Sequence, residues 1–208
     1  MTRLRSVLIV IVILSGCTQH EDTYSRNKNA IADALSYNSL VVHGIDKIRQ
    51  LGVSINFNHI HDFTRLSFRE NVVRYIKTVD TSHTHTAAIL VYRIYPPKPH
   101  FKSYRDFYQA VSANLKATKK RFGNILKYKI KPAHQHGQWC VSRRIKYVPQ
   151  LTLNGSFIYD SYEMICKHPY RPNFYINFAY SERYTKDRYP GKIKQRVSKA
   201  LNNISFIK

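Results

Sequence analysis

The spacing of apolar residues along the chain predicts most of its elements. Residues 87–95 form an apolar run that predicts a strand, which Pro96 and Pro97 end. Ser103 and Asp106 then resemble a capping box. Apolar or small residues follow at helical spacing before Gly123, namely Phe107, Val111, Leu115, Thr118 and Phe122. We therefore expect a helix between Ser103 and Gly123.

The pattern on either side of this helix predicts mainly strands. Residues 39–51 fit a short helix ended by Gly52, and residues 53–57 alternate like a half-buried strand. Residues 67–79 fit either a helix that begins at a capping box, Ser67 to Glu70, or a strand. Four further strands are expected at 125–131, 138–148, 156–166 and 173–180, with Asn154-Gly155 as a hairpin turn.

The end of the chain predicts a second main helix. Pro190 suits its first position, and its apolar stripe would contain Ile193, Val197, Ala200, Leu201 and Ile204. Phe206 and Ile207 are expected to dock the tail on the core. The fold class that follows is α+β: a single domain over residues 39–208, in which an antiparallel sheet of about five or more strands is packed by two main helices.

The first residues have a different character. Arg3 and Arg5 precede an apolar run of about ten residues, which is too short to span a bilayer stably and is typical of a signal peptide. A buried strand and an ordinary secretory signal are the alternatives. Residues 18–30 are polar and without periodicity, which is typical of a tether.

Leu14-Ser15-Gly16-Cys17 resembles the lipobox of bacterial lipoproteins. The resemblance covers residues 1–17 and implies cleavage before Cys17, which then carries a diacylglyceryl group and usually a further acyl chain. Two or more chains anchor a protein stably. It predicts a signal peptide at 1–16, a lipidated cysteine and polar tether at 17–38, and the folded domain after them. Thr18 in place of Asp favours the outer membrane, with the domain facing the periplasm.

If Cys17 carries lipid, two cysteines remain, Cys140 and Cys166. An even pair in an oxidising compartment predicts a disulfide. It would close a loop of about 26 residues and contribute about 3 kcal/mol in the chain-entropy model. A tight turn at Asn154-Gly155 would not place the two directly opposite, so either a bulge near Pro149 aligns them, the bridge joins non-neighbouring strands, or they stay free thiols.

The chain is strongly basic. Its formal net charge is +22, and removal of Arg3 and Arg5 leaves 32 basic against 12 acidic residues, a charge of +20. Such an excess favours polyanionic partners. The export signal argues against nucleic acid and favours anionic envelope components or an acidic protein. A basic background composition with solvated faces is the simpler explanation.

The best candidate binding surface lies between Asp106 and Asp160, where no acidic residue occurs. Three lysines alternate along one predicted strand and share one face, and three further cations lie on the next strand. We predict a basic face composed of Lys127, Lys129, Lys131, Arg143, Arg144 and Lys146. Many tyrosines in the last third of the chain suit an interface or are simply strand formers.

Three His-x-His pairs are weak metal candidates. On a strand the two imidazoles of a pair share a face, which suits Zn²⁺ or Cu²⁺ if further ligands converge, with Asp62 as one candidate. The simpler interpretation is exposed loop residues. The six residues are His59, His61, His83, His85, His134 and His136. No metal or other cofactor is predicted.

Catalytic signatures are lacking, because the chain contains neither Gly-x-Ser-x-Gly nor His-Glu-x-x-His, and no glycine-rich phosphate loop. We therefore predict a non-enzymatic, lipid-anchored envelope protein that binds a protein or an anionic envelope component as an adaptor. One alternative is an immunity lipoprotein that neutralises a toxin in the periplasm. Another is a metal-binding lipoprotein built on the histidine pairs.

Overall fold

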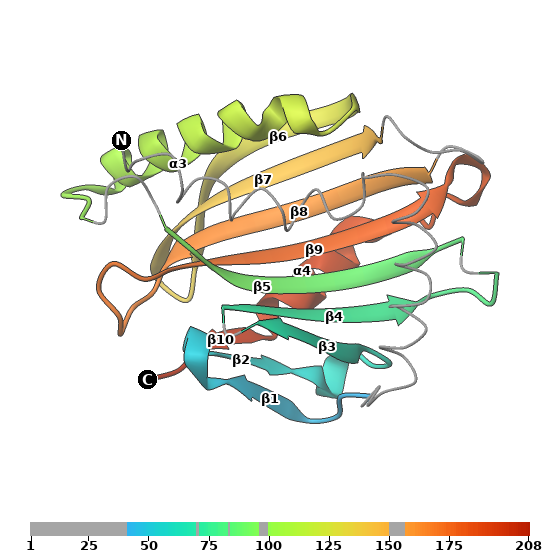
Figure 1. Ribbon diagram of the computed structural model, residues 1–208, viewed down its shortest axis with the longest axis horizontal. Helices are drawn as coiled ribbons and strands as arrows, with labels where there is room; N and C mark the ends of the chain where they lie inside the picture. Colours follow the sequence, from blue (N-terminus) through green and yellow to red (C-terminus); the bar gives the residue numbers. More distant parts are fainter. Residues whose placement is uncertain (1–40, 70, 83, 96–99, 150–156) are drawn as a thin grey trace. The chain divides into compact units, whose positions relative to one another are not determined.

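A long antiparallel sheet dominates the computed structural model, which describes residues 41–69, 71–82, 84–95, 100–149 and 157–208 (Figure 1). The strand order is β3-β4-β5-β9-β8-β7-β6. The bounds are β3 (Thr64–Arg69), β4 (Val72–Thr78), β5 (Thr86–Ile94), β6 (Asn124–Gln135), β7 (Gln138–Val148), β8 (Phe157–Lys167) and β9 (Tyr175–Thr185). These strands confirm the five predicted between residues 87 and 180. Within residues 67–79, Ser67–Arg69 belongs to β3 and Val72–Thr78 to β4, so the strand alternative was right for these residues and the helix alternative wrong.

A second sheet was not predicted. It consists of β1 (Ile45–Ile48), β2 (Val53–Asn56) and β10 (Ile204–Phe206), with β2 in the centre. The helix expected at 39–51 was wrong: this stretch holds β1 and a 3-10 turn, η1 (Arg49–Leu51), and Gly52 turns the chain with φ 64°. The strand β10 pairs with β2 from the far end of the chain, which local patterns do not reveal.

The helix α3 (Tyr104–Ala117) covers one face of the long sheet. Its start is as predicted, because the Ser103 hydroxyl accepts a hydrogen bond from the Asp106 N–H at 3.1 Å. A 3-10 turn, η3 (Thr118–Arg121), continues it. Its apolar side packs on β7, β8 and β9 in a cluster made of Phe107, Val111, Leu115, Val141, Ile165 and Tyr175.

The helix α4 (Ile193–Asn202) and the small sheet cover the other face, where the larger core cluster lies. Ile193, Val197 and Ala200 are buried there, as the predicted stripe requires. Two details differ. Lys192 caps the helix with φ 43°, so Pro190 lies before its start. Ile204 begins β10, because pairing with β2 replaces the last helical turn.

Cys140 and Cys166 form a disulfide, as predicted. They lie directly opposite each other on β7 and β8, and both are fully buried. The register that a tight turn at Asn154-Gly155 would impose was wrong, since Tyr147 pairs with Tyr159 and this places the cysteines in line without a bulge. The turn itself lies outside the described residues.

Within the described ranges, no helix is both long and apolar enough to cross a membrane. The described strands and helices all belong to one unit, residues 40–208, which agrees with the single α+β domain expected there. The predicted signal peptide, Cys17 and the tether lie outside the described residues.

Candidate functional site: a basic strand face beside a buried charge network

Five of the six predicted cations share one face of β6 and β7. The register pairs Lys127 with Lys146 and Lys129 with Arg144, and Lys131 lies beside Ser142. The three lysines of β6 are exposed, whereas Arg144 and Lys146 are half-buried. From here on, the basic face means Lys127, Lys129, Lys131, Arg144 and Lys146.

Arg143 does not belong to this face, so its inclusion was wrong. Side chains alternate along a strand, and Arg143 therefore points toward α3. It is buried and donates two hydrogen bonds to Glu163 at 2.7 and 2.6 Å. Burial by itself lowers the pKa of Arg143, but the Glu163 carboxylate outweighs it and the pKa of Arg143 is raised. This residue is a structural cation.

Arg144 and Lys146 are held by neighbours, unlike the lysines of β6. Arg144 forms a bidentate ion pair with the buried Asp160, at 3.0 and 2.6 Å. The Lys146 ammonium lies 5.7 Å from the Tyr184 ring and 5.1 Å from the Tyr189 ring. Among the described residues, no salt bridge involves Lys127, Lys129 or Lys131. These three charges are thus available to an external anion.

The position of β6 gives its lysines a second role. The strand is at the edge of the long sheet and pairs with β7 alone. Charged residues on an edge strand discourage pairing with strands of other chains. Pro132 lies on the same strand and also discourages such pairing, because it has no N–H group to donate.

The basic face adjoins a row of buried charges that the sequence analysis did not single out. Lys146 lies opposite Asp160, and Asp160 lies opposite Glu182 on β9. Both carboxylates are fully buried. The sequence contains a signal for both carboxylates, because Asp160 alternates with Ile158 and Tyr162 along β8 and Glu182 alternates with Tyr180 and Tyr184 along β9.

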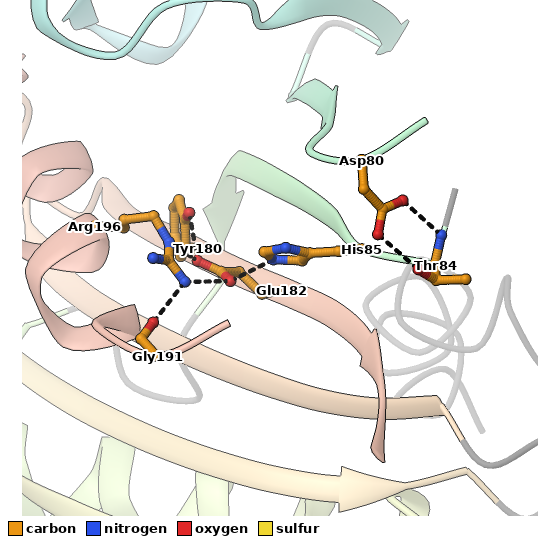
Figure 2. Close-up of polar contacts among 7 residues, drawn as sticks. All are labelled: Asp80, Thr84, His85, Tyr180, Glu182, Gly191 and Arg196. Atoms are coloured by element: carbon orange, nitrogen blue, oxygen red, sulfur yellow. Dashed lines mark hydrogen bonds and ion pairs between the residues drawn. The ribbon is translucent and has the colours of Figure 1, made fainter. Parts of the chain in front are cut away.

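Glu182 is the centre of a hydrogen-bond network that joins three elements. Figure 2 shows Arg196 of α4 and His85 approaching its carboxylate from opposite sides. Arg196 donates to it at 2.7 and 2.9 Å, the His85 Nε2–H at 2.7 Å, and the Tyr180 hydroxyl at 2.8 Å. Burial raises the pKa of Glu182, but these hydrogen bonds outweigh it and the pKa is lowered. Glu182 is therefore an ionised clamp between α4 and the long sheet.

The turn before β5 presents His85 to this network. The Asp80 carboxylate accepts hydrogen bonds from the Thr84 N–H at 2.9 Å and from the Thr84 hydroxyl at 2.6 Å (Figure 2). These bonds to Thr84 lower the pKa of Asp80 to about 2. The closed turn holds the start of β5 in place and fixes the direction of His85.

Two tyrosines, Tyr162 and Tyr184, are neighbours of the Asp160 carboxylate. The hydroxyls of Tyr162 and Tyr184 are buried. Burial and the nearby Asp160 carboxylate raise the pKa of Tyr162 to about 12 and raise that of Tyr184 as well. Both phenols therefore stay protonated and able to donate.

The histidine pairs do not converge. His85 binds Glu182, while His83 lies outside the described residues. His59 and His61 are exposed. His134 packs against the Tyr104 ring, and the His136 Nε2 lies 2.8 Å from the Ile204 carbonyl oxygen. In the part of the chain that the structure describes, no three His, Cys, Asp or Glu residues group as metal ligands.

Comparisons with known proteins do not assign a family. No protein-family profile and no curated protein matches the sequence. LpqN of Mycobacterium tuberculosis, involved in cell envelope biogenesis, has a similar structure with a TM-score of 0.49 and 11% identity, covering 86% of this chain and 97% of that one. For cyanobacterial PsbP (CyanoP) of Synechocystis sp. PCC 6803 the TM-score is 0.45 at 7% identity, covering 81% and 96%. These values are too low to carry a functional argument.

Proposed function

We propose that this chain is a non-enzymatic, lipid-anchored protein of the bacterial envelope whose basic face captures an acidic partner. Cys17 would carry the lipid, in the outer membrane and facing the periplasm. The polar residues after Cys17 would tether the domain to the membrane and leave it free to orient toward its partner.

One observation carries the binding proposal. The lysines of β6 form a row of three exposed like charges, with Arg144 and Lys146 on the neighbouring strand. Like charges on one face repel each other unless they are solvated or face an anion. A protein or envelope component with carboxylates or phosphates at matching spacing would relieve this repulsion.

The test is affinity capture from membranes with the full chain. The variant Lys127→Glu/Lys129→Glu/Lys131→Glu should lose its partner, because charge complementarity becomes repulsion. The matched control is Lys186→Glu/Lys194→Glu/Lys199→Glu, which changes three exposed lysines outside the basic face. The control and the test variant therefore have the same net charge as each other. Equal capture by both variants would contradict the proposal. Binding should also weaken with added salt.

The anchor is tested separately. Cys17→Ser should release the chain from the outer-membrane fraction, since no thiol remains for acylation. Mass spectrometry of the mature chain should show a diacylglyceryl group on Cys17. An unmodified N-terminus at a site other than Cys17 would contradict the anchoring.

A further inference from the structure

One end of the long sheet carries four cations that each lie over an aromatic ring. The Arg93 guanidinium lies 4.5 Å from the Tyr95 ring and 4.1 Å from the Phe174 ring, and Arg171 lies 5.4 Å from Phe174. Lys167 lies 5.3 Å from Trp139, and Lys208 lies 5.8 Å from Tyr170. We call this set the end cluster: Arg93, Tyr95, Trp139, Lys167, Tyr170, Arg171, Phe174 and Lys208.

Strand register places the strand residues of the end cluster at one end of the sheet, with Lys167 and Trp139 on the face that α3 covers and Arg93 on the opposite face. Here β5 and β8 end while β7 and β9 begin, so Lys167 pairs with Tyr175 and Arg93 with Ile176. Figure 1 shows this end at the left, where an orange-red loop joins β8 to β9. The end cluster thus collects the tips of four strands, whereas the basic face runs along the flat of two.

The loop of the end cluster is firmly held. Arg171 donates to the carbonyl oxygens of Gln50 at 2.9 Å and Arg49 at 2.8 Å. The His168 Nε2–H donates to the Gly52 carbonyl at 2.8 Å, and the Tyr170 N–H donates to the other ring nitrogen at 3.2 Å. A surface fixed in this way loses little conformational entropy on binding.

Two tyrosines of the end cluster are unusually exposed. Tyr95 is 61% and Tyr170 52% exposed. Tyr rings concentrate at membrane interfaces, because the ring is apolar and the hydroxyl stays hydrated. Over the described residues, no salt bridge involves any of the four cations, so their charge is not neutralised within the domain.

We propose that the end cluster docks against a bilayer with anionic headgroups. Lys167, Arg171 and Lys208 would contact lipid phosphates, and Tyr95 and Tyr170 would enter the interface. Charge complementarity favours an anionic bilayer over a zwitterionic one. The proposal deepens the proposed membrane attachment and rests on it, since an acyl anchor would keep the domain near the bilayer.

The only tryptophan of the chain, Trp139, lies in the end cluster and reports on docking. The full chain is mixed with phosphatidylcholine vesicles that contain a nitroxide-headgroup lipid, with or without phosphatidylglycerol. We expect Trp139 fluorescence to be quenched only when phosphatidylglycerol is present, and the quenching to fall with added salt. No quenching, or equal quenching in both vesicles, would overturn the proposal.

Matched variants locate the contact. Tyr170→Ser/Lys208→Glu should weaken docking at least about tenfold, because each basic residue near the surface contributes roughly fivefold. This variant leaves the reporter Trp139 and its neighbour Lys167 unchanged. The control Val79→Ser/Lys186→Glu changes an exposed apolar residue and an exposed lysine beyond the other end of the sheet, and its Trp139 should be quenched as strongly as in the unaltered chain. Equal weakening by both variants would overturn the proposal.

Two further variants distinguish a failure of this docking proposal from a failure of the proposed function. If the Lys127→Glu/Lys129→Glu/Lys131→Glu chain loses quenching while Tyr170→Ser/Lys208→Glu keeps it, the basic face binds the bilayer and the end cluster does not. The Cys17→Ser chain cannot be acylated. Quenching of its Trp139 fluorescence by anionic vesicles would support docking even if Cys17 proves unmodified in cells. Unquenched Trp139 fluorescence in this variant would overturn docking.

Discussion

Asp160 and Glu182 lie directly opposite each other on adjacent strands, and both carboxylates are fully buried. Each has its own arginine: Arg144 from β7 for Asp160, and Arg196 from α4 for Glu182. Two buried like charges in register are tolerable only with such partners. The pair therefore ties the basic strand face and α4 to the same point of the sheet.

Replacement of Glu182 tests this clamp. Glu182→Gln should lower the free energy of unfolding by about 2 kcal/mol, less than the roughly 3–5 kcal/mol expected for a fully buried broken pair, because Arg196 is partly exposed. Urea unfolding gives the value. Asp187→Asn, at an exposed carboxylate, should change stability by less than about 0.5 kcal/mol. A Gln variant as stable as the unaltered chain would contradict the clamp.

The effect of Glu182 should depend on pH. Its pKa in the folded chain lies below the ordinary 4.5, so the carboxylate stabilises the fold above the unfolded-state pKa. That contribution is lost as pH falls through 4.5 toward the folded-state value. The difference in unfolding free energy between the unaltered chain and Glu182→Gln should hence shrink as the solution is acidified. A difference that grows on acidification would contradict a lowered pKa of Glu182.

Arg143 and Glu163 should behave as a coupled pair on the α3 side. Arg143→Met leaves Glu163 buried without its cation and should cost about 3–5 kcal/mol, and Arg143→Met/Glu163→Met should recover much of it. A double-mutant cycle of urea unfolding measures the coupling. Additive effects would show that the two are independent. Variants that still fold should keep partner capture, because Arg143 is absent from the basic face.

Gly52 is expected to tolerate no side chain. It has φ 64°, and a Cβ there would clash with His168 Nε2. Gly52→Ala should therefore cost more than the roughly 1–2 kcal/mol of the left-handed conformation alone. Gly137→Ala is the control, since Gly137 has φ 75° and open space around it. Equal losses in thermal unfolding would mean that the His168 contact is unimportant.

The disulfide should contribute measurably to stability. Reduction of Cys140–Cys166, which encloses a sequence separation of 26, should lower the free energy of unfolding by about 3 kcal/mol. Cys140→Ala/Cys166→Ala serves as the control, because reductant should not change its stability. A reductant effect of equal size on that variant would assign the loss to another cause.

Much of the α+β fold could be predicted because its signals are local. The cap at Ser103, the alternation along β7 and β8, and the cysteine pair each depend on near neighbours or composition. The small sheet could not be predicted, since β2 gains its partner β10 from the other end of the chain. Residues 39–51 were misassigned because their helical spacing is satisfied equally by β1 followed by a 3-10 turn.

For the candidate site, the sequence by itself determined the cluster of positive charge and the shared face of Lys127, Lys129 and Lys131, since both follow from composition and from strand alternation. The predicted place of Arg143 on this face was wrong, because alternation along β7 turns its side chain to the face that α3 covers, where it is buried against Glu163. The burial of Asp160 and Glu182, the place of His85 and the end cluster were decided by tertiary structure alone. These features depend on which strands are neighbours and on which face of the sheet α4 covers. Both arrangements arise from packing over the whole domain.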